Sequence, residues 1–295
     1  MRLNVGIENI LVNVMQFGAH GDGTSDDSQA FASAWDSACN AGGMSTLVVP
    51  AGQSFMVTKL NFSGPCTAQI NIQVLFFHAC NNLIVRNLEI SNSPQSHVCV
   101  NMCNGATFSH ISINAPATSP NTDGFDISDS SNILIQDSNI KSGDDCIAVN
   151  GGCSFINATR VTCGPGHGIS VGSLGRSGER DTVSDVYVQN CTFIETSNGA
   201  RIKTVPGGSG YAKHITFDQI ILQNVKNPII IDQNYGVDNE ATNVEVSFVT
   251  YRGFRGTSAS DVAINLVCGP SIDSTCKNAH GTVTNTIPNV SGLTN

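Results

Sequence analysis

A repeated pattern of apolar residues constrains the fold of this chain more than any other feature. Seven ten-residue windows share apolar residues at their third, fifth and tenth places, and they begin at Asn81, Asn104, Ser131, Gly152, Ser184, Lys213 and Thr242. Only Ser154 departs from this rule. The third and fifth places alternate as in a strand, and the windows start 23, 27, 21, 32, 29 and 29 residues apart. This spacing predicts one supersecondary unit per repeat, which is typical of a solenoid.

The kind of solenoid follows from what each repeat can bury. A single unit cannot cover its own apolar face, so successive units must stack, with parallel strands about 4.8 Å apart. The leucine-rich framework L-x-x-L-x-L is absent, and propeller blades need longer periods. Charged residues make up only 13% of the chain and Gly numbers 29, a mix that suits strands and turns. The sequence therefore predicts an all-β parallel β-helix.

One segment near the N-terminus has helical periodicity instead. Between Ser25 and Asn40 the apolar residues fall on one face, and two glycines follow as a stop signal. We expect a short helix that caps the end of the β-helix. We expect a single domain over residues 1–295, with the cap at about 17–66 and regular coils at about 81–276.

Charge and hydropathy narrow the partners of such a chain. The formal net charge is −9, and phosphate binding needs a concentrated excess of Lys and Arg, so we expect no nucleic acid or anionic membrane as a partner. No stretch approaches the roughly 20 apolar residues that span a bilayer. Residues 1–20 lack the ordered charged, apolar and small-residue regions of a signal peptide. An acidic ligand would need a local basic patch.

Polar residues gather in four short motifs. These are Asn121-Thr122-Asp123-Gly124, Gly143-Asp144-Asp145-Cys146, Gly166-His167-Gly168 and Arg201-Ile202-Lys203. Each charged residue or histidine in them falls between 13 and 19 residues after the start of its own window, so we expect them on one flank of successive coils. Four stacked coils extend over roughly 14 Å. The motifs could therefore form one patch long enough to contact an extended ligand.

The residue types in this patch favour glycoside hydrolysis. One protonated carboxyl can assist the leaving oxygen while an ionised carboxylate activates water. Mutual repulsion among Asp123, Asp144 and Asp145 should raise the pKa of at least one of them. Arg201 and Lys203, two apart on a strand, can project together and attract an anionic sugar. Taken alone, Asp-Gly and Gly-Asp-Asp are ordinary turn signals. The interpretation as a catalytic site depends on all four motifs occurring together in this order.

The four motifs resemble, in order and one coil apart, those of the polygalacturonases, glycoside hydrolase family 28. The similarity runs from Phe17 to about Cys276, and includes the segments Cys163-Gly164-Pro165-Gly166-His167-Gly168 and Asn227-Pro228-Ile229-Ile230-Ile231-Asp232-Gln233-Asn234-Tyr235. The resemblance implies a right-handed, pectin-lyase-like β-helix. It also implies inverting hydrolysis of α-1,4-linked galacturonan, with pectic polysaccharide as the partner. The remaining histidines show no ligand spacing, so we expect no metal, and we also expect no cofactor and a monomer.

The resemblance also assigns roles to individual residues. Asp144 would be the proton donor, and Asp123 with Asp145 would activate water. His167 would hold the protonation state of the acid or a sugar hydroxyl. The remaining predicted residues would bind substrate, and they are Asn121, Arg201, Lys203 and Tyr235. Arg201 and Lys203 would bind galacturonate carboxylates, and Tyr235 would line the adjoining subsite.

The cysteines and glycosylation sequons favour an oxidising compartment. Eleven cysteines with no C-x2-C pair fit disulfides better than zinc. The sequons stand at Asn61, Asn157, Asn190 and Asn289. By analogy with the family, Cys146 and Cys163 would form a disulfide. Further expected pairs are Cys39–Cys66 and Cys268–Cys276, with a free thiol among Cys80, Cys99, Cys103, Cys153 and Cys191. We expect secretion to the extracellular space or cell wall.

Two departures from the family pattern leave other functions open. Between Ile72 and Val74 this chain passes directly across a place where the family carries further early coils, and Gly236 replaces a cysteine. A catalytically impaired pectin-binding relic is therefore one alternative. Two further alternatives are a rhamnogalacturonan hydrolase of the same family and a calcium-dependent pectate lyase. The paired cations disfavour the rhamnogalacturonan hydrolase, and the three carboxylates disfavour the lyase.

Overall fold

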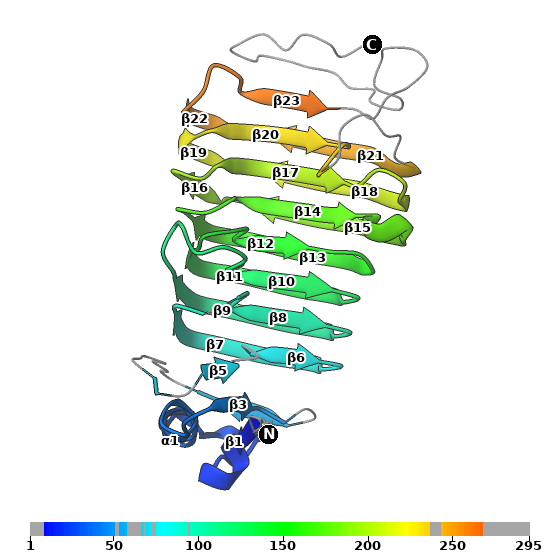
Figure 1. Cartoon of the computed structure of the whole chain (residues 1–295). Helices are drawn as coiled ribbons and strands as arrows, with labels where there is room; N and C mark the ends of the chain where they lie inside the picture. Colours follow the sequence, from blue (N-terminus) through cyan, green and yellow to red (C-terminus); the bar gives the residue numbers. More distant parts are fainter. Residues whose placement is uncertain are drawn as a thin grey trace, which may run out of the picture.

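The chain forms a tall stack of parallel strands (Figure 1). The computed structural model describes residues 9–50, 53–57, 66–67, 69–71, 75–93, 95–236 and 243–267. Every strand pairing among them is parallel, and each coil contributes strands to two long sheets. The predicted parallel β-helix is confirmed.

The first long sheet has eight strands within the described residues. In stacking order they are β6 (Phe76–His78), β8 (Val98–Asn101), β10 (Phe125–Ser128), β12 (Ile147–Val149), β14 (Ile169–Leu174), β17 (Asn198–Thr204), β20 (Asn227–Asp232) and β23 (Ile264–Val267). Its strands are short, and the loops that precede them carry most of the predicted site residues.

The second long sheet has ten described strands. Seven follow one path, namely β7 (Asn81–Ser91), β9 (Asn104–Asn114), β11 (Ser131–Lys141), β13 (Cys153–Cys163), β15 (Arg180–Gln189), β18 (Ser209–Asp218) and β21 (Asn243–Arg252). Three shorter strands lie off that path, β16 (Thr192–Ile194), β19 (Ile221–Val225) and β22 (Arg255–Ser258). A short 3-10 helix, η2 (Arg176–Gly178), precedes β15.

The observed register confirms most of the repeat and corrects two windows. Asn81 pairs with Asn104, and Asn104 with Ser131, as predicted. Ser131 pairs with Ser154 rather than Gly152, so that coil begins two residues later than predicted and the exception at Ser154 disappears. A shift of two residues keeps the alternation of a strand, so the pattern alone could not reveal the error.

The last window is wrong by five residues, because Lys213 pairs with Ser247 and not with Thr242. The window took Val244 and Val246 as its third and fifth places, but they pair with Gly210 and Ala212 and lie before the bend of the coil, whereas those places follow the bend in the first three windows. The bend itself is at Phe248, whose φ of 53° is in the left-handed region. The corresponding position of earlier coils is also left-handed, with φ 55° at Asn82 and 57° at Asn132. Asn tolerates this conformation better than most residues, which accounts for many of the asparagines.

The interior is filled by large apolar side chains from successive coils. Phe108 and Phe125 are fully buried, with ring centroids 5.3 Å apart in an edge-to-face contact. Ile127, Ile133 and Ile135 are buried equally deeply. The core of the regular coils is therefore continuous from one layer to the next.

The N-terminal cap contains one helix and two small sheets. Its elements are β1 (Asn9–Asn13), the 3-10 helix η1 (Val14–Phe17), β2 (Asp22–Asp26), α1 (Ser28–Cys39), β3 (Met44–Val48), β4 (Ser54–Met56) and β5 (Gln69–Asn71). Strands β1, β3 and β5 form one sheet, and β2 pairs with β4. No helix among the described residues is long and apolar enough to cross a membrane.

The helix α1 buries the predicted face, with Phe31, Ala34, Trp35 and Ala38 inside. It begins three residues later than predicted, because residues 22–26 form β2. The buried carboxylate of Asp27 accepts backbone N–H groups from the preceding loop, which fixes the turn into the helix.

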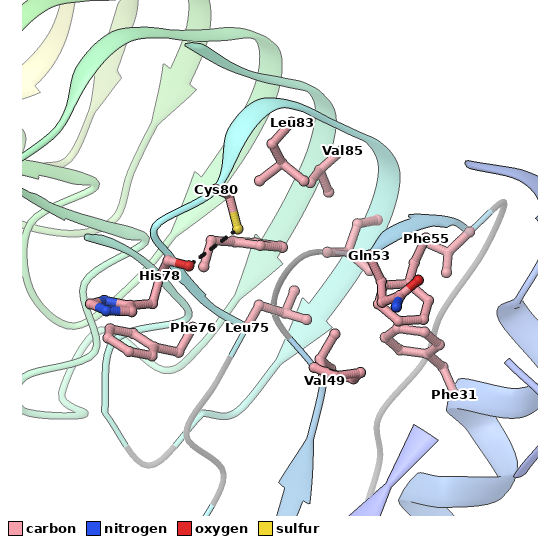
Figure 2. A pocket seen from close by; sticks show the side chains of 14 residues that line it. Phe31, Val49, Gln53, Phe55, Leu75, Phe76, His78, Cys80, Leu83 and Val85 are labelled. Carbon is pink, nitrogen blue, oxygen red and sulfur yellow. Dashed lines mark hydrogen bonds between the residues drawn. The ribbon is translucent and has the colours of Figure 1, made fainter. Parts of the chain in front are cut away.

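Among the described residues the stack of paired strands does not run on from the cap into the regular coils. Within the described residues no strand pairing joins β5 to β6 or β7. A cavity of about 50 Å³ lies at this junction, lined largely by apolar side chains from both sides, among them Phe31, Phe55, Leu75, Phe77, Val85 and Leu88 (Figure 2). The interruption falls where the sequence departs from the family pattern.

Candidate active site

The predicted site residues meet on the outer face of the eight-stranded sheet. Phe125, Ile147 and Ile169 pair across three successive coils and point inward. Asp123, Asp145 and His167 each lie two residues before one of these positions. Arg201 pairs with Ser170 one coil further on. Residues far apart in the sequence therefore form one cluster, as the offsets predicted.

Asp145 is the centre of this cluster. Its Oδ1 accepts hydrogen bonds from Arg201 Nη2 at 2.5 Å and from Ser170 Oγ at 2.8 Å. Its Oδ2 accepts one from Lys203 Nζ at 2.8 Å. The Asp145 side chain is only 2% exposed. Two cations therefore hold one buried carboxylate, and charge-assisted bonds of this kind are the strong ones.

Asp123 and Asp144 share one backbone donor. The N–H of Asp145 lies 2.9 Å from Oδ1 of Asp123 and 2.9 Å from Oδ1 of Asp144. Asp144 Oδ1 also lies 2.8 Å from Nδ1 of His167. One ligand atom each from Asp144, Asp145 and His167 lies within 4.8 Å of the other two. Arg201 and Lys203 already neutralise Asp145, so this group is electrostatically poor for a metal ion.

Asp123 and Asp144 have pKa values shifted in opposite directions, and the raised pKa is not that of the expected proton donor. Burial, together with repulsion from Asp145 and Asp144, raises the pKa of Asp123 to about 7. Burial also acts to raise the pKa of Asp144, but the His167 hydrogen bond and the charges of His167 and Lys203 outweigh it and lower that pKa. The raised pKa therefore belongs to Asp123 and not to Asp144, the expected acid.

The two predicted carboxylate-binding cations are less exposed than the sequence suggested. The side chains of Arg201 and Lys203 are 10% and 9% exposed. The Tyr235 ring covers both, with its centroid 5.9 Å from the guanidinium carbon and 5.1 Å from the ammonium nitrogen. Asn121 is exposed in a preceding loop and takes no part in these hydrogen bonds in the described part of the chain.

Two residues that sequence reasoning did not select also belong to this region. Asp126 lies on the same outer face, its pKa is raised mainly by burial, and it accepts a hydrogen bond from Asn150 at 2.5 Å. His97 is fully buried, and its backbone N–H and Nδ1 lie 2.7 and 3.0 Å from the carbonyl oxygen of Asp123. Its spacing of 26 residues from Asp123, about one coil, was the only available signal.

The disulfides agree with two of the three expected pairs. Cys146, which follows Asp145, is bonded to Cys163 at the end of β13, and Cys39 is bonded to Cys66 in the cap. The expected Cys268–Cys276 pair lies outside the described residues. Five described cysteines are free, namely Cys80, Cys99, Cys103, Cys153 and Cys191.

The glycosylation sequons lie apart from the cluster or outside the described residues. Asn157 is half-buried in β13, and Asn190 is exposed just after β15, so both belong to the ten-stranded sheet. Asn61 and Asn289 lie outside the described residues. Glycosylation at these positions remains a prediction.

Carboxylates clustered on one sheet face of a parallel β-helix are the groups that glycoside hydrolysis needs. The chain belongs to the glycosyl hydrolases family 28, whose model matches residues 73–291. It is 42% identical to a probable polygalacturonase of Arabidopsis thaliana, over 90% of this chain and 71% of that protein, and 37% identical to a polygalacturonase of Malus domestica, over 88% and 71%.

The structural comparison gives the same fold. A polygalacturonase from Erwinia carotovora superposes with a TM-score of 0.61 at 22% identity, over 87% of this chain and 78% of that chain. The Arabidopsis alignment extends over 325 positions, more than the 295 residues of this chain. That relative therefore contains residues without a counterpart here, in agreement with the interrupted stack.

Proposed function

We propose that this chain is a polygalacturonase that hydrolyses α-1,4-galacturonosidic bonds in pectin. The observation that carries the proposal is the convergence of three carboxylates, one histidine and two cations on one face of the eight-stranded sheet. The relatives named as polygalacturonases supply the substrate class. The cations would recognise galacturonate carboxylates, with Tyr235 and Asn121 lining the adjoining positions.

In the proposed mechanism Asp144 protonates the leaving oxygen. In the described part of the chain the hydrogen bonds from His167 and from the N–H of Asp145 both reach Oδ1 of Asp144, which leaves Oδ2 to carry the proton. Burial is already the largest single influence on the pKa of Asp144 and acts to raise it. A bound polysaccharide would exclude water and strengthen that influence, so the pKa would rise when substrate binds.

Asp123 and Asp145 would orient the attacking water, and we propose that the anomeric configuration is inverted. One oxygen of Asp144 lies within 4.8 Å of one oxygen of Asp145. This is a closest approach of two atoms, whereas the roughly 6.5–9.5 Å of inverting enzymes separates whole carboxyl groups, so it does not choose between inversion and retention. The burial of Asp145 supports inversion, because a side chain that is 2% exposed, with both oxygens already accepting hydrogen bonds, is poorly placed to attack the sugar directly. Proton NMR of the first-formed anomer tests this step, and a retained configuration would contradict it.

Reducing-end release from polygalacturonate by the purified protein tests the proposed activity. Viscosity measured in the same reaction distinguishes internal from terminal cleavage. Absence of reducing ends, with binding retained, would instead identify a pectin-binding relic. That alternative is disfavoured because the cluster is complete despite the interrupted stack.

The remaining alternatives differ in substrate or product. A parallel assay on rhamnogalacturonan tests the related hydrolase, which the pair of cations disfavours because uniform galacturonate presents more carboxylates. A lyase would release unsaturated products that absorb in the ultraviolet, and membership of a hydrolase family argues against it.

We also propose that the protein acts outside the cell, in the cell wall, as a monomer with pectic polysaccharide as its partner. Two disulfides support an oxidising compartment. The net charge of −9 argues against nucleic acid and anionic membranes as partners. Fractionation of the expressing tissue and the solution mass of the purified protein test location and oligomeric state.

A further inference from the structure

The outer face that carries the acid cluster continues to the first coil of the eight-stranded sheet. Phe76 of β6 pairs with Cys99 of β8, and Cys99 pairs with Asp126 of β10. Side chains alternate along a strand, so Phe76 faces the same side as Asp126. The intervening Phe77 points inward, with its ring centroid 5.5 Å from that of Phe108. The first coil therefore presents an aromatic side chain on the face that carries the catalytic cluster.

Phe76 and His78 form a small exposed platform. Their ring centroids lie 5.6 Å apart with an interplanar angle of 16°, and Phe76 is 46% exposed. Figure 2 shows the two rings side by side, away from Leu83 and Val85. A stacked pair of exposed rings offers a flat apolar surface next to an imidazole that can form hydrogen bonds.

A series of polar side chains runs from this platform to the strand that contains Asp126. Nδ1 of His78 lies 2.8 Å from Oδ1 of Asn101. Asn101 Nδ2 in turn donates to Ser128 Oγ at 2.9 Å, at the end of the strand that contains Asp126. Adjacent coils are about 4.8 Å apart, so β6 lies only about 10 Å from β10 along the stack. The platform and the cluster are close enough to contact different sugars of one chain.

We propose that Phe76 and His78 form a distal subsite that binds a second pyranose unit of the same galacturonan chain. The C–H face of a pyranose ring packs on the Phe76 ring, and a ring hydroxyl bonds to His78. This surface requires no carboxylate from the sugar, so it accepts free and methyl-esterified units alike. The inference rests on the proposed function, because continuity with the catalytic face identifies the occupant.

The experiment compares galacturonate oligomers of increasing length as substrates. In the wild-type protein KM falls once an oligomer is long enough to reach from the cluster to Phe76. Phe76→Ala removes most of this decrease in KM. KM for long oligomers then rises about tenfold, which corresponds to about 1.4 kcal/mol, and kcat changes little. His78→Ala gives a smaller increase, because the Phe76 ring remains.

The matched control is Ile84→Ala, which truncates a 64% exposed apolar side chain of β7 on the other long sheet. It leaves the length dependence unchanged. Thermal unfolding of each variant shows whether the coil still folds. If Phe76→Ala does not fold, His78→Ala is used as the test variant.

Three outcomes separate this inference from the proposed function. Turnover by the wild type with the same length dependence in Phe76→Ala and His78→Ala overturns the subsite and leaves the function intact. Absence of wild-type turnover on every galacturonan overturns the function, and Phe76-dependent binding of the oligomers by calorimetry would then still support the subsite. A dimer that dissociates in Phe76→Ala assigns the platform to a second copy of this chain and overturns the subsite.

Discussion

The regular coils and the N-terminal cap are built from the same kind of strand, but within the part of the chain that the structure describes only the coils form a continuous stack. Each coil from β7 onward pairs in register with the next, and large side chains fill its interior. The cap pairs its own strands and meets the coils across a cavity of about 50 Å³. Because a solenoid derives its stability from interfaces between neighbouring layers, an interruption at one end can leave distant layers intact. The acid cluster lies in those distant layers.

The largest expected effect tests whether catalysis belongs entirely to the coils. Asp144→Asn removes the proposed proton donor while keeping its shape, and we expect kcat on polygalacturonate to fall roughly 10²- to 10⁴-fold in a variant that is still folded by thermal unfolding. The matched control in the cap is Asp36→Asn, an exposed aspartate of α1 that loses the same charge. Similar losses in both variants would contradict the division between the two regions.

The repeat was readable from the sequence because its apolar positions face one continuous core. The same pattern could not fix the register of the fourth and last windows. A two-residue shift at Ser154 preserves the alternation, and the left-handed bend at Phe248 is not encoded by hydrophobicity. The apolar periodicity thus predicts the architecture, whereas left-handed backbone positions determine the register between neighbouring coils.

The site shows a similar limit. The order and spacing of the motifs brought together Asp123, Asp145 and His167. They did not reveal that Arg201 and Lys203 would be bonded to Asp145, because three-dimensional pairing of charges depends on side-chain direction and burial. Nor did they reveal which carboxyl keeps its proton. That depends on desolvation, which a sequence does not specify.

The next largest effect concerns the cost of burying charge in the coils. Asp123 has its pKa raised from 3.8 to about 7, so the folded protein binds this proton more tightly than the unfolded chain. Its contribution to stability is fully present below pH 3.8 and is lost as the pH rises through about 7. Asp123→Asn should therefore gain roughly 3–4 kcal/mol relative to the wild type between pH 4 and pH 8.

Urea unfolding of both proteins at the two pH values measures this difference directly. The pKa of Asp126 is also raised, but Asp126 is present in both proteins, so its contribution largely cancels in the comparison. A constant difference between the variant and the wild type from pH 4 to pH 8 would show that the pKa of Asp123 is the same in the folded and the unfolded protein.

Removing each disulfide in turn should lower the stability of the protein similarly but affect its activity differently. Cys39–Cys66 closes a separation of 27 residues in the cap, and Cys146–Cys163 closes 17 residues beside Asp145. Replacing either pair by alanine should cost about 3 kcal/mol in unfolding free energy. Only the second double variant should also lose activity, because Cys146 follows Asp145 in the chain. Loss of activity in the cap variant at a temperature where it remains folded would show that the cap supports the site.

The smallest effect tests the cavity itself, at two residues that occupy the same place in the repeat. Val85 lines the cavity, whereas Val188 is buried in a continuous part of the stack. Val85→Ile should add about 0.8 kcal/mol of stability, because one more methylene enters unfilled apolar space. Val188→Ile should instead cost about 1 kcal/mol or more, because a densely packed layer has no room for it. The sign of the difference between these two melting temperatures is decisive: equal destabilisation would mean that the junction is packed as tightly as the coils.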